Sequence, residues 1–451
     1  MNVKDLLNIT DGSLIVGNSE FNLDGRDFVK DSREVKEGDI YVALKGEKFD
    51  GNDFYLDAVN KGAKVCIITK NLTDGELKIV KNKGINIIKV EDTLGALQKF
   101  AKFKRNLYNI PVVAITGSVG KTSTKDMIAS VMKEKYNTLK TEGNYNNEIG
   151  VPLTILRLNN EEAMCIEMGM NHFGEIRKLT NIARPTIAVI TNIGTAHIGN
   201  LGSRENILKA KMEILEGLIG NTVIINNDND LLNKWAIENK DKYNIITYGI
   251  KNNSKYMAKS IKSYENKSEF YINNQKIIVP VGGEHFVLNS LCAIAVGNEL
   301  NIPMDKIAEG IKNLDLSKKR MEIIKNEIGT TIINDTYNAN YDSMKAAIEY
   351  LKEIKNKRKI AVLGDMLELG SYSEKLHKDV GLLVDKNIDI LITVGKESKY
   401  IAEKSNAKEI YEFDSNNQAI EKLKSIITKD DVILLKASNS MNFNEITNSI
   451  K

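Results

Sequence analysis

The sequence lacks the features that mark secreted, membrane-bound and disulfide-rich proteins. Its start, MNVKDLLNITDGSL, has no apolar stretch of signal-peptide length, and no later run approaches the roughly 18 apolar residues of a membrane-spanning helix. Cysteine occurs three times, always in an apolar context (KVCIIT, AMCIEM and SLCAIAV) and never in a close pair. We therefore expect buried, reduced thiols in a cytosolic protein that does not act on membranes.

An excess of one charge is also missing. The 63 basic and 60 acidic side chains leave a net charge of +3, so the composition gives no attraction to nucleic acid. The hydrophobic fraction of 42% and the charged fraction of 27% are ordinary for a globular protein. A chain of 451 residues exceeds what one hydrophobic core usually supports, which predicts two or three domains.

Three blocks follow one another along the chain, and all three indicate an α/β fold. Residues 1–107 alternate short strand-like and helix-like runs, which predicts a small α/β domain. Residues 108–313 contain apolar strands that each lead through a polar loop into a helix, which predicts a mostly parallel sheet. Residues 314–451 repeat that pattern, which predicts a second, Rossmann-like sheet.

The segment VVAITGSVGKTSTKDMI joins an apolar strand to a helix through a glycine-containing turn. Gly117 and Gly120 let backbone N–H groups approach phosphate oxygens, and the start of the helix adds its positive end. Lys121 can reach the terminal phosphates, and Thr122 can offer its hydroxyl to Mg²⁺. Ile115 stands where the full P-loop pattern has its first glycine, so an ordinary strand-to-helix turn is the alternative. We favour a nucleoside triphosphate site.

Three more polar residues stand near the ends of predicted strands or on a helix. Glu167 ends one strand, where open α/β sheets bind ligands, although it could simply cap the next turn. His197 follows the next strand and could join Glu167 at Mg²⁺, or be an ordinary hydrogen-bonded loop residue. Lys211 lies beside the apolar face of a helix expected over residues 203–218, where it either extends into solvent or meets a specific partner.

The stretch INDTYNANYDSMKAAI places a polar loop between a predicted strand and a predicted helix. Such junctions commonly hold ligands in α/β proteins. The helix that follows has one apolar face, which predicts core packing for Met344, Ala347, Ile348 and Leu351.

Seven stretches in all three blocks together resemble the Mur ligases of peptidoglycan synthesis. They are DSREVKEGDIYVALKGEKFDG, ITGSVGKTSTK, EGNYNNEIGVPLTILRL, EMGMNHFGEI, TNIGTAHIGNLGSRENILKAK, DTYNANYDSMKAAI and LGDMLELGSYSEKLH. The GNYNNEIG, DTYNAN and LGDMLELG forms resemble the branch of the family that adds the terminal dipeptide. The resemblance implies a UDP-binding N-terminal domain, a central P-loop ATPase domain, and a Rossmann-like C-terminal domain that closes over the nucleotide.

The resemblance also implies an activity, which is an ATP- and Mg²⁺-dependent amide ligase of cell-wall synthesis, acting as a monomer. ATP would phosphorylate the terminal carboxylate of UDP-N-acetylmuramoyl tripeptide, and the amino group of D-alanyl-D-alanine would attack the acyl phosphate. Such precursors are needed for cell shape and cell division. Two alternatives remain: another amide ligase, such as the tripeptide-forming Mur ligase or folylpolyglutamate synthase, and an inactive nucleotide-binding relative.

Residue roles follow from positions that match the family. Lys121 would hold the phosphates, Thr122, Glu167 and His197 would bind metal, and Lys211 matches a lysine that several relatives carbamylate into a further metal ligand. The other nucleotide contacts would be Gly117, Ser118, Val119, Gly120, Ser123, Asn289, Arg320, Asp335, Tyr337 and Asn338, with Asp335 at the ribose. The UDP-linked substrate would meet Ser32, Arg33, Asn144, Asn146 and Asn147.

Three positions depart from what the family usually has. Phe286 replaces an asparagine near the expected adenine contact, and Asn439 replaces an arginine near the C-terminus. Tyr341 replaces a proline at the helix start, so we expect Asn340 or Asp342 to cap that helix instead.

Overall fold

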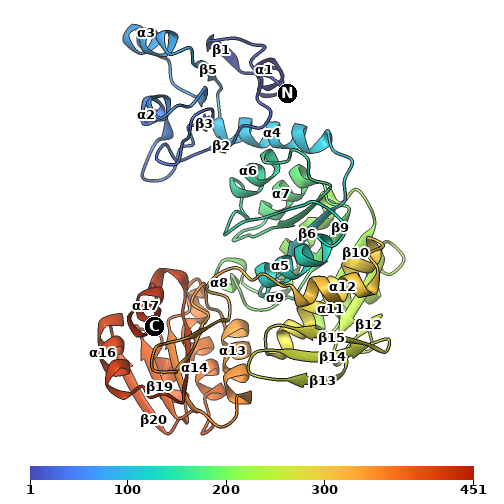
Figure 1. Cartoon of the computed structure of the whole chain (residues 1–451), viewed down its shortest axis with the longest axis vertical. Coiled ribbons are helices and arrows are strands. Elements are labelled where there is room, and N and C mark those ends of the chain that lie inside the picture. The colour runs from blue at the N-terminus through green and yellow to red at the C-terminus, as the bar shows by residue number, and fades with distance from the viewer.

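The computed structural model describes residues 1–451 and arranges them as three units in chain order. In Figure 1 the N-terminal unit lies at the top, the central unit in the middle and the C-terminal unit at the lower left. Each unit has its own mostly parallel sheet, and a small antiparallel sheet is added to the central unit. The predicted α/β fold class is confirmed.

The N-terminal unit has a five-stranded sheet in the order β1-β5-β4-β3-β2, in which only β1 runs antiparallel to its neighbour. Capping boxes begin two of its helices, Asn2 with Asp5 and Thr73 with Glu76, because these side chains satisfy the free N–H groups of a first turn. Its elements are α1 (Val3–Thr10), β1 (Ser13–Val16), β2 (Phe28–Val29), β3 (Ile40–Val42), η1 (Gly51–Asp53), α2 (Tyr55–Asn60), β4 (Val65–Ile68), α3 (Asp74–Asn82), β5 (Asn86–Lys89) and α4 (Thr93–Asn106).

The central unit has a seven-stranded sheet in the order β12-β11-β10-β9-β6-β8-β7, with every neighbouring pair parallel. Its first part comprises β6 (Val112–Thr116), α5 (Lys121–Met132), β7 (Thr138–Lys140), α6 (Gly150–Leu156), β8 (Ala163–Glu167), α7 (Glu175–Ala183), β9 (Ile187–Ile190), α8 (Ile198–Leu201), α9 (Arg204–Met212) and η2 (Glu213–Gly217). Its second part comprises β10 (Thr222–Asn226), α10 (Asp230–Asn239), β11 (Asn244–Gly249), β12 (Tyr256–Met257), β13 (Lys259–Ser263), β14 (Ser268–Ile272), β15 (Gln275–Val279), α11 (Glu284–Glu299) and α12 (Met304–Lys312).

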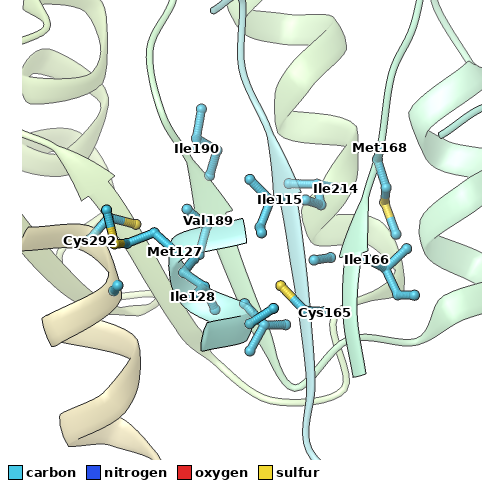
Figure 2. Packing of buried hydrophobic residues seen from close by; sticks show 14 of the residues in the cluster. Ile115, Met127, Ile128, Cys165, Ile166, Met168, Val189, Ile190, Ile214 and Cys292 are labelled. Atoms are coloured by element: carbon cyan, nitrogen blue, oxygen red, sulfur yellow. The ribbon is translucent and has the colours of Figure 1, made fainter. Parts of the chain in front are cut away.

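Helices cover the central strands, which explains why β6, β8 and β9 are apolar along most of their length. Figure 2 shows Ile115, Cys165 and Val189 of this sheet beside Met127 of α5 and Cys292 of α11. All three cysteines are buried free thiols, as predicted.

The helix predicted over residues 203–218 is only half correct. The α-helix ends at Met212, and a tighter 3₁₀ turn, η2, continues to Gly217. The carboxylate of Glu213 accepts the backbone N–H groups of Gly174 and Arg177 at the start of α7. Gly217 lies so close to Thr180 that an added Cβ would come within 2.3 Å of its carbonyl oxygen. These contacts bind the segment to α7, and sequence periodicity does not report them.

The C-terminal unit has a six-stranded sheet in the order β16-β17-β21-β18-β19-β20, in which only β16 is antiparallel to its neighbour. Met344, Ala347, Ile348 and Leu351 of α13 are buried, as predicted. The elements are β16 (Glu322–Lys325), β17 (Thr331–Asn334), α13 (Tyr341–Glu353), β18 (Arg358–Gly364), η3 (Gly370–Tyr372), α14 (Ser373–Leu383), β19 (Ile390–Val394), α15 (Lys399–Lys404), β20 (Glu409–Phe413), α16 (Asn416–Ile426), β21 (Asp431–Lys436), η4 (Asn439–Met441) and α17 (Asn444–Ile450).

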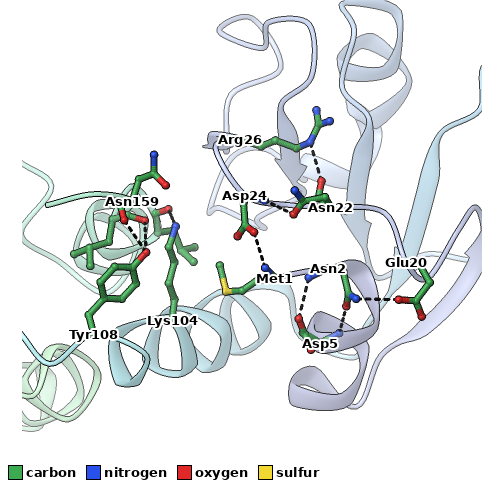
Figure 3. A network of polar contacts seen from close by, with 12 residues as sticks. Met1, Asn2, Asp5, Glu20, Asn22, Asp24, Arg26, Lys104, Tyr108 and Asn159 are labelled. Carbon is green, nitrogen blue, oxygen red and sulfur yellow. Dashed lines mark hydrogen bonds and ion pairs between the residues drawn. The ribbon is translucent and has the colours of Figure 1, made fainter.

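Helix α4 joins the N-terminal unit to the central one. Near its C-terminal end Lys104 Nζ donates to the carbonyl oxygen of Leu156 over 2.6 Å, and Tyr108 Oη donates to that of Asn159 over 3.1 Å (Figure 3). None of the helices combines the length and the apolar character needed to cross a membrane.

Candidate functional site

Three loops meet at one edge of the central sheet. Strand β6 lies between β8 and β9, so the loops that follow these three strands share the carboxyl edge of the sheet. After β6 the chain forms β7 and β8 on one side of that strand, and it then crosses to form β9 on the other side. This reversal makes the edge a topological switch point. The segment 117–122, the phosphate loop, follows β6 at that point.

The phosphate loop is fixed by the loop after β9. Val119 N–H donates to Asn192 Oδ1 over 2.9 Å, and Thr191 Oγ1 donates to the carbonyl oxygen of Val119 over 2.7 Å. Gly117 is needed here, because a Cβ would come within 1.9 Å of Thr191 Oγ1. Gly120 (φ 78°) is the N-cap of α5 and provides no side chain to its first turn, so the N–H groups of that turn can bind an anion.

Lys121 folds back over this loop. Its Nζ donates to the carbonyl oxygen of Gly117 over 2.9 Å. Burial lowers the pKa of Lys121, while the nearby Glu167 carboxylate opposes that shift. A partly desolvated ammonium group above free N–H groups is a suitable site for phosphate oxygens.

Glu167 is buried at the end of β8 and does not cap the following turn. Its Oε1 accepts a hydrogen bond from Asn146 Nδ2 over 2.8 Å, whereas its Oε2 is buried with no hydrogen-bond partner. A buried carboxylate oxygen without a partner is costly, so a cation is the missing partner that the structure indicates.

Arg320 lies in the linker between α12 and β16, residues 313–321, and contacts the phosphate loop. Its Nη2 donates to Thr122 Oγ1 over 3.1 Å, and its guanidinium group lies 3.7 Å from the ring centroid of Tyr337. This arginine is therefore held in place by a hydrogen bond and a cation–π contact, and is not a freely solvated linker residue. Its Nε is buried and has no hydrogen-bond partner.

His197 and Lys211 lie close enough to Lys121 for its charge to act on both of them. Burial lowers the pKa of His197, a nearby Glu368 opposes this, and the positive charges of Lys121 and Lys211 add to it. Lys211 is 1% exposed, so it does not extend into solvent. Burial, and then the charge of Lys121, hold the pKa of Lys211 well below its usual value. A buried lysine with a lowered pKa gives up its proton more readily than an exposed one, and the neutral amine is the nucleophilic form.

Two cavities flank the phosphate loop. The first, of about 250 Å³, lies between α11, the linker and the C-terminal unit, and its lining includes Val119, Gly120, Ser123, Phe286, Asn289, Arg320, Asp335 and Lys436. The second, of about 310 Å³, has a lining that includes Ser118, Lys121, Thr122, Asn144, Asn146, Asn147, Glu167, His197, Arg320, Tyr337 and Asn338. Arg320 and the phosphate loop line both cavities, so a ligand in one can reach a ligand in the other.

Four sequence-predicted site residues line neither cavity. Gly117 belongs to the phosphate loop and Lys211 to α9, whereas Ser32 and Arg33 belong to the N-terminal unit. Arg33 is exposed and forms an ion pair with Asp31 at 2.6 Å.

Sequence reasoning missed Lys436 at the end of β21. Its buried Nζ donates to the Asp335 carboxylate and, over 3.0 Å, to the carbonyl oxygen of Asn338. Burial lowers the pKa of Lys436, and Asp335 opposes that shift. The sequence did contain a signal for this residue, because Lys436 is a charged residue at the end of an apolar strand, as Glu167 is at the end of β8.

The three positions at which the sequence departs from the usual family pattern, Phe286, Tyr341 and Asn439, differ in what the structure shows. Phe286 is 1% exposed and lines the first cavity, and Asn289 Oδ1 there accepts from Thr124 Oγ1 over 3.0 Å. Asn340 is the N-cap of α13 and forms a capping box with Ser343, which confirms one of the two predicted caps. The structure shows no particular role for Asn439 at the start of η4.

Comparisons with known proteins agree with this geometry. Three family models match: the Mur ligase family catalytic domain at residues 28–105, the Mur ligase middle domain at 115–297, and the Mur ligase glutamate ligase domain at 319–439. A UDP-N-acetylmuramoyl-tripeptide--D-alanyl-D-alanine ligase of Bacillus subtilis is 37% identical, and the match covers 93% of this chain and 92% of the relative. The chain belongs to the Mur ligase family.

Solved structures are similar to this Mur ligase over almost its whole length. MurF from Acinetobacter baumannii has a TM-score of 0.89 at 30% identity, with 100% of this chain and 98% of that chain covered. MurF ligase from Thermotoga maritima, solved in complex with ADP, has a TM-score of 0.82 at 30% identity, with 94% and 97% covered.

The donors of this Mur ligase fit a magnesium ion that is bound together with phosphates. No cluster of three or more His, Cys, Asp or Glu side chains stands ready to hold a metal by itself. Glu167 supplies an unpartnered carboxylate oxygen and Thr122 a hydroxyl. Mg²⁺ typically takes one or two protein oxygens and completes its shell with phosphate oxygens and water.

Proposed function

We propose that this Mur ligase joins D-alanyl-D-alanine to UDP-N-acetylmuramoyl tripeptide, using ATP and releasing ADP and phosphate. The observation that carries the proposal is the pair of cavities joined by Arg320 and the phosphate loop. One cavity suits a nucleotide and the other an acceptor carboxylate, as a reaction between the two requires. The choice of dipeptide and tripeptide rests on the full-length relative of that name.

In the proposed complex, ATP occupies the first cavity. Asn289 faces the base, Asp335 accepts hydrogen bonds from the ribose, and Arg320 reaches the phosphates. Asp335 already pairs with Lys436, so a ribose hydroxyl shares this carboxylate with the ammonium group. The free N–H groups in the first turn of α5, from residues 121–123, and the ammonium group of Lys121 hold the β- and γ-phosphates.

The acceptor carboxylate lies in the second cavity, among Asn144, Asn146 and Asn147. Tyr337 and Asn338 border this cavity as well, on the side of the C-terminal unit. The UDP end of the acceptor extends to Ser32 and Arg33. We assign residues 1–107 to UDP-substrate binding, 108–313 to ATP binding, and 314–451 to the domain that closes over the nucleotide.

Mg²⁺ would be held by Thr122, Glu167 and His197, and by Lys211 if that lysine is carbamylated. When bound, the ion offsets the negative charge of the phosphates and the carboxylate. Lys121 and Arg320 lower the repulsion between two anions that must approach each other. An oxygen of the acceptor carboxylate forms a bond to the γ-phosphorus, and ADP leaves. The dipeptide amine then bonds to the acyl carbon, loses a proton, and phosphate leaves with the electrons of its C–O bond.

Closure of the C-terminal unit excludes water from the acyl phosphate, which would otherwise be hydrolysed. We also propose that the enzyme acts as a monomer in the cytosol, where ATP and nucleotide-linked precursors are available.

The test measures phosphate release and product mass with ATP, Mg²⁺ and UDP-N-acetylmuramoyl tripeptide, with and without D-alanyl-D-alanine. We expect phosphate release that depends on the dipeptide, and a product whose mass exceeds that of the tripeptide substrate by two alanine residues.

Lys121→Ala should lower turnover at least a thousandfold, which corresponds to roughly 4 kcal/mol of transition-state stabilisation. Lys133→Ala, on an exposed position beyond the same helix, should leave turnover unchanged. Release that ignores the dipeptide, or that needs a single amino acid instead, would refute this assignment.

A further inference from the structure

The LGDMLELG stretch, residues 363–370, lines neither of the two cavities described above. It follows β18 and leads into η3 as a loop that is firmly held by its own unit. The carboxylate of Asp365 accepts the backbone N–H groups of residues 396–398. Met366 donates its N–H to Nε2 of His377 over 2.9 Å. So many local bonds fix the direction in which the rest of the loop projects.

The far end of the loop docks on the central unit. A Cβ on Gly199 of α8 would come within 2.8 Å of the carbonyl oxygen of Glu368 and 2.9 Å of Gly370 N, so the two backbones touch. Nearby, Tyr372 Oη donates to the carbonyl oxygen of Gly202 over 2.8 Å. These contacts cross between two units, and they exist only while the units are together.

Glu368 extends its side chain from this loop to His197. Its Oε2 lies 3.0 Å from His197 Nδ1, which has no other partner, and the Nδ1–H direction is not aligned with that oxygen. The contact is therefore electrostatic here, and rotation of the ring toward Glu368 would make it a hydrogen bond. Both residues have left-handed backbones, at φ 64° and 63°. Strain of this kind persists where the surroundings require it, often at functional sites.

The only polar side-chain contact of His197 is the one that Nδ1 makes with Glu368, so Nε2 forms no hydrogen bond with the protein, and the ring lines the second cavity. Glu368 thus occupies one side of the imidazole and leaves the other side to a ligand. A carboxylate behind a metal-binding histidine is a common arrangement, because it fixes the tautomer and makes the ring a better donor.

We propose that Glu368 is a positioning residue that the C-terminal unit delivers on closure, holding the proton of His197 on Nδ1 and leaving Nε2 free for a metal ion. This rests on the proposed function, in which His197 is a metal ligand. The metal site then becomes complete only when the two units meet, which links metal binding to closure.

The first test observes the tautomer directly. The chain has four histidines, so their ¹⁵N resonances can be separated by NMR and His197 identified from a His197→Asn sample. With the ATP analogue AMP-PNP and no metal, wild-type His197 should carry its proton on Nδ1. Glu368→Gln should give a mixture of both tautomers, because an amide can donate as well as accept.

The second test measures the affinity for Mn²⁺ by EPR in the presence of AMP-PNP. Glu368→Gln should raise the Kd for Mn²⁺ about tenfold, and Glu368→Asp should recover part of the loss. Glu374→Gln is the matched control, because this glutamate of α14 pairs only with Lys378 at the surface, and its Kd should stay at the wild-type value. In a His197→Asn background, Glu368→Gln should have no further effect, since its action passes through the ring.

An unchanged tautomer together with an unchanged Mn²⁺ affinity in Glu368→Gln would overturn the proposal, as would an equal loss of affinity in the His197→Asn background. A wild-type protein that binds no Mn²⁺ with AMP-PNP would instead overturn the proposed function. The two failures are therefore distinguishable.

Discussion

Single side chains near the first cavity have protonation states that depend on burial. His285, at the start of α11, lines this cavity beside Asp335 and Lys436. Burial lowers the pKa of His285 to about 4, although Asp335 acts in the opposite direction. The folded protein therefore holds this imidazole neutral under conditions in which an exposed histidine begins to take up a proton.

This lowered pKa predicts a loss of stability on mild acidification. In the unfolded chain the pKa of a histidine is about 6.5, so below that pH the unfolded chain binds a proton that the native state does not bind. The free energy of unfolding therefore falls as the pH drops from about 7.5 to 5. His285→Gln should remove about 2 kcal/mol of that loss, seen as a smaller difference between urea unfolding at pH 7.5 and pH 5. His172→Gln, at an exposed position, should keep the wild-type pH dependence. Parallel pH profiles for wild type and His285→Gln would contradict the prediction.

Among single residues, the sequence predicted those that belong to a local motif with a known chemistry. It did not predict those whose role depends on a contact with a distant part of the chain. Lys121 and Thr122 were predictable because a glycine turn before a helix selects for them. Lys436 ends an apolar strand, which was a usable signal for its position, but its partner Asp335 lies 101 residues away in the chain. Glu368 was not assigned because its partner His197 is still more distant in the chain. Only the fold brings such pairs together.

Among the elements, α13 shows how a helix can begin without a proline in its first turn. Asn340 Oδ1 accepts the N–H of Ser343 over 2.9 Å, and Ser343 Oγ accepts the N–H of Asn340 over 3.0 Å. Asp342 is thereby free for another task, and its Oδ2 accepts from both the N–H and the Oγ1 of Thr195 in the central unit.

Loss of this cap should destabilise the C-terminal unit measurably. Asn340→Ala should lower the free energy of unfolding by about 1 kcal/mol, because the first-turn N–H groups lose their acceptor. Urea titration followed by circular dichroism would measure it. Ser415→Ala makes a close comparison, since Ser415 is the N-cap of α16 but its side chain forms no cap hydrogen bond. Equal effects from the two substitutions would show that the capping box contributes nothing.

Apolar strands were predicted well and polar ones poorly. The runs that became β6, β8, β9 and β10 stand out because both faces of that sheet are covered. The sheet of β13, β14 and β15 was not predicted, because β13 is mostly exposed and lysine-containing and gives no apolar pattern. Its stability comes from pairing with β14 and from packing on α11 and α12, which are distant interactions.

For the whole molecule, the central and C-terminal units are in direct contact, with little space between them. Gly194 shows this most clearly, because an added Cβ would come within 2.2 Å of Asp342 Oδ2. A side chain at this position would push away the carboxylate that bridges to Thr195.

Gly194→Ala should therefore favour the open arrangement. Displacing Asp342 sacrifices two hydrogen bonds to Thr195, about 1.5 kcal/mol, so closure should become roughly tenfold less favourable and the KM for ATP should rise to match. Small-angle X-ray scattering with AMP-PNP should give a larger radius of gyration than wild type. Gly75→Ala, where an added Cβ meets nothing within 4 Å, should leave both quantities unchanged. A compact Gly194→Ala protein with normal KM would contradict the steric argument.

The three free thiols have a practical consequence for studying this motion. Burial raises the pKa of Cys66 and of Cys292 to about 12, and it raises that of Cys165 as well. At neutral pH none of them presents a thiolate to an electrophile, because the thiolate is the reactive form. We therefore expect maleimide dyes to label the native chain very little. Two cysteines introduced at the surface, one on each side of the closing interface, would carry a fluorophore pair without background labelling, and the opening and closing of single molecules could be followed in real time.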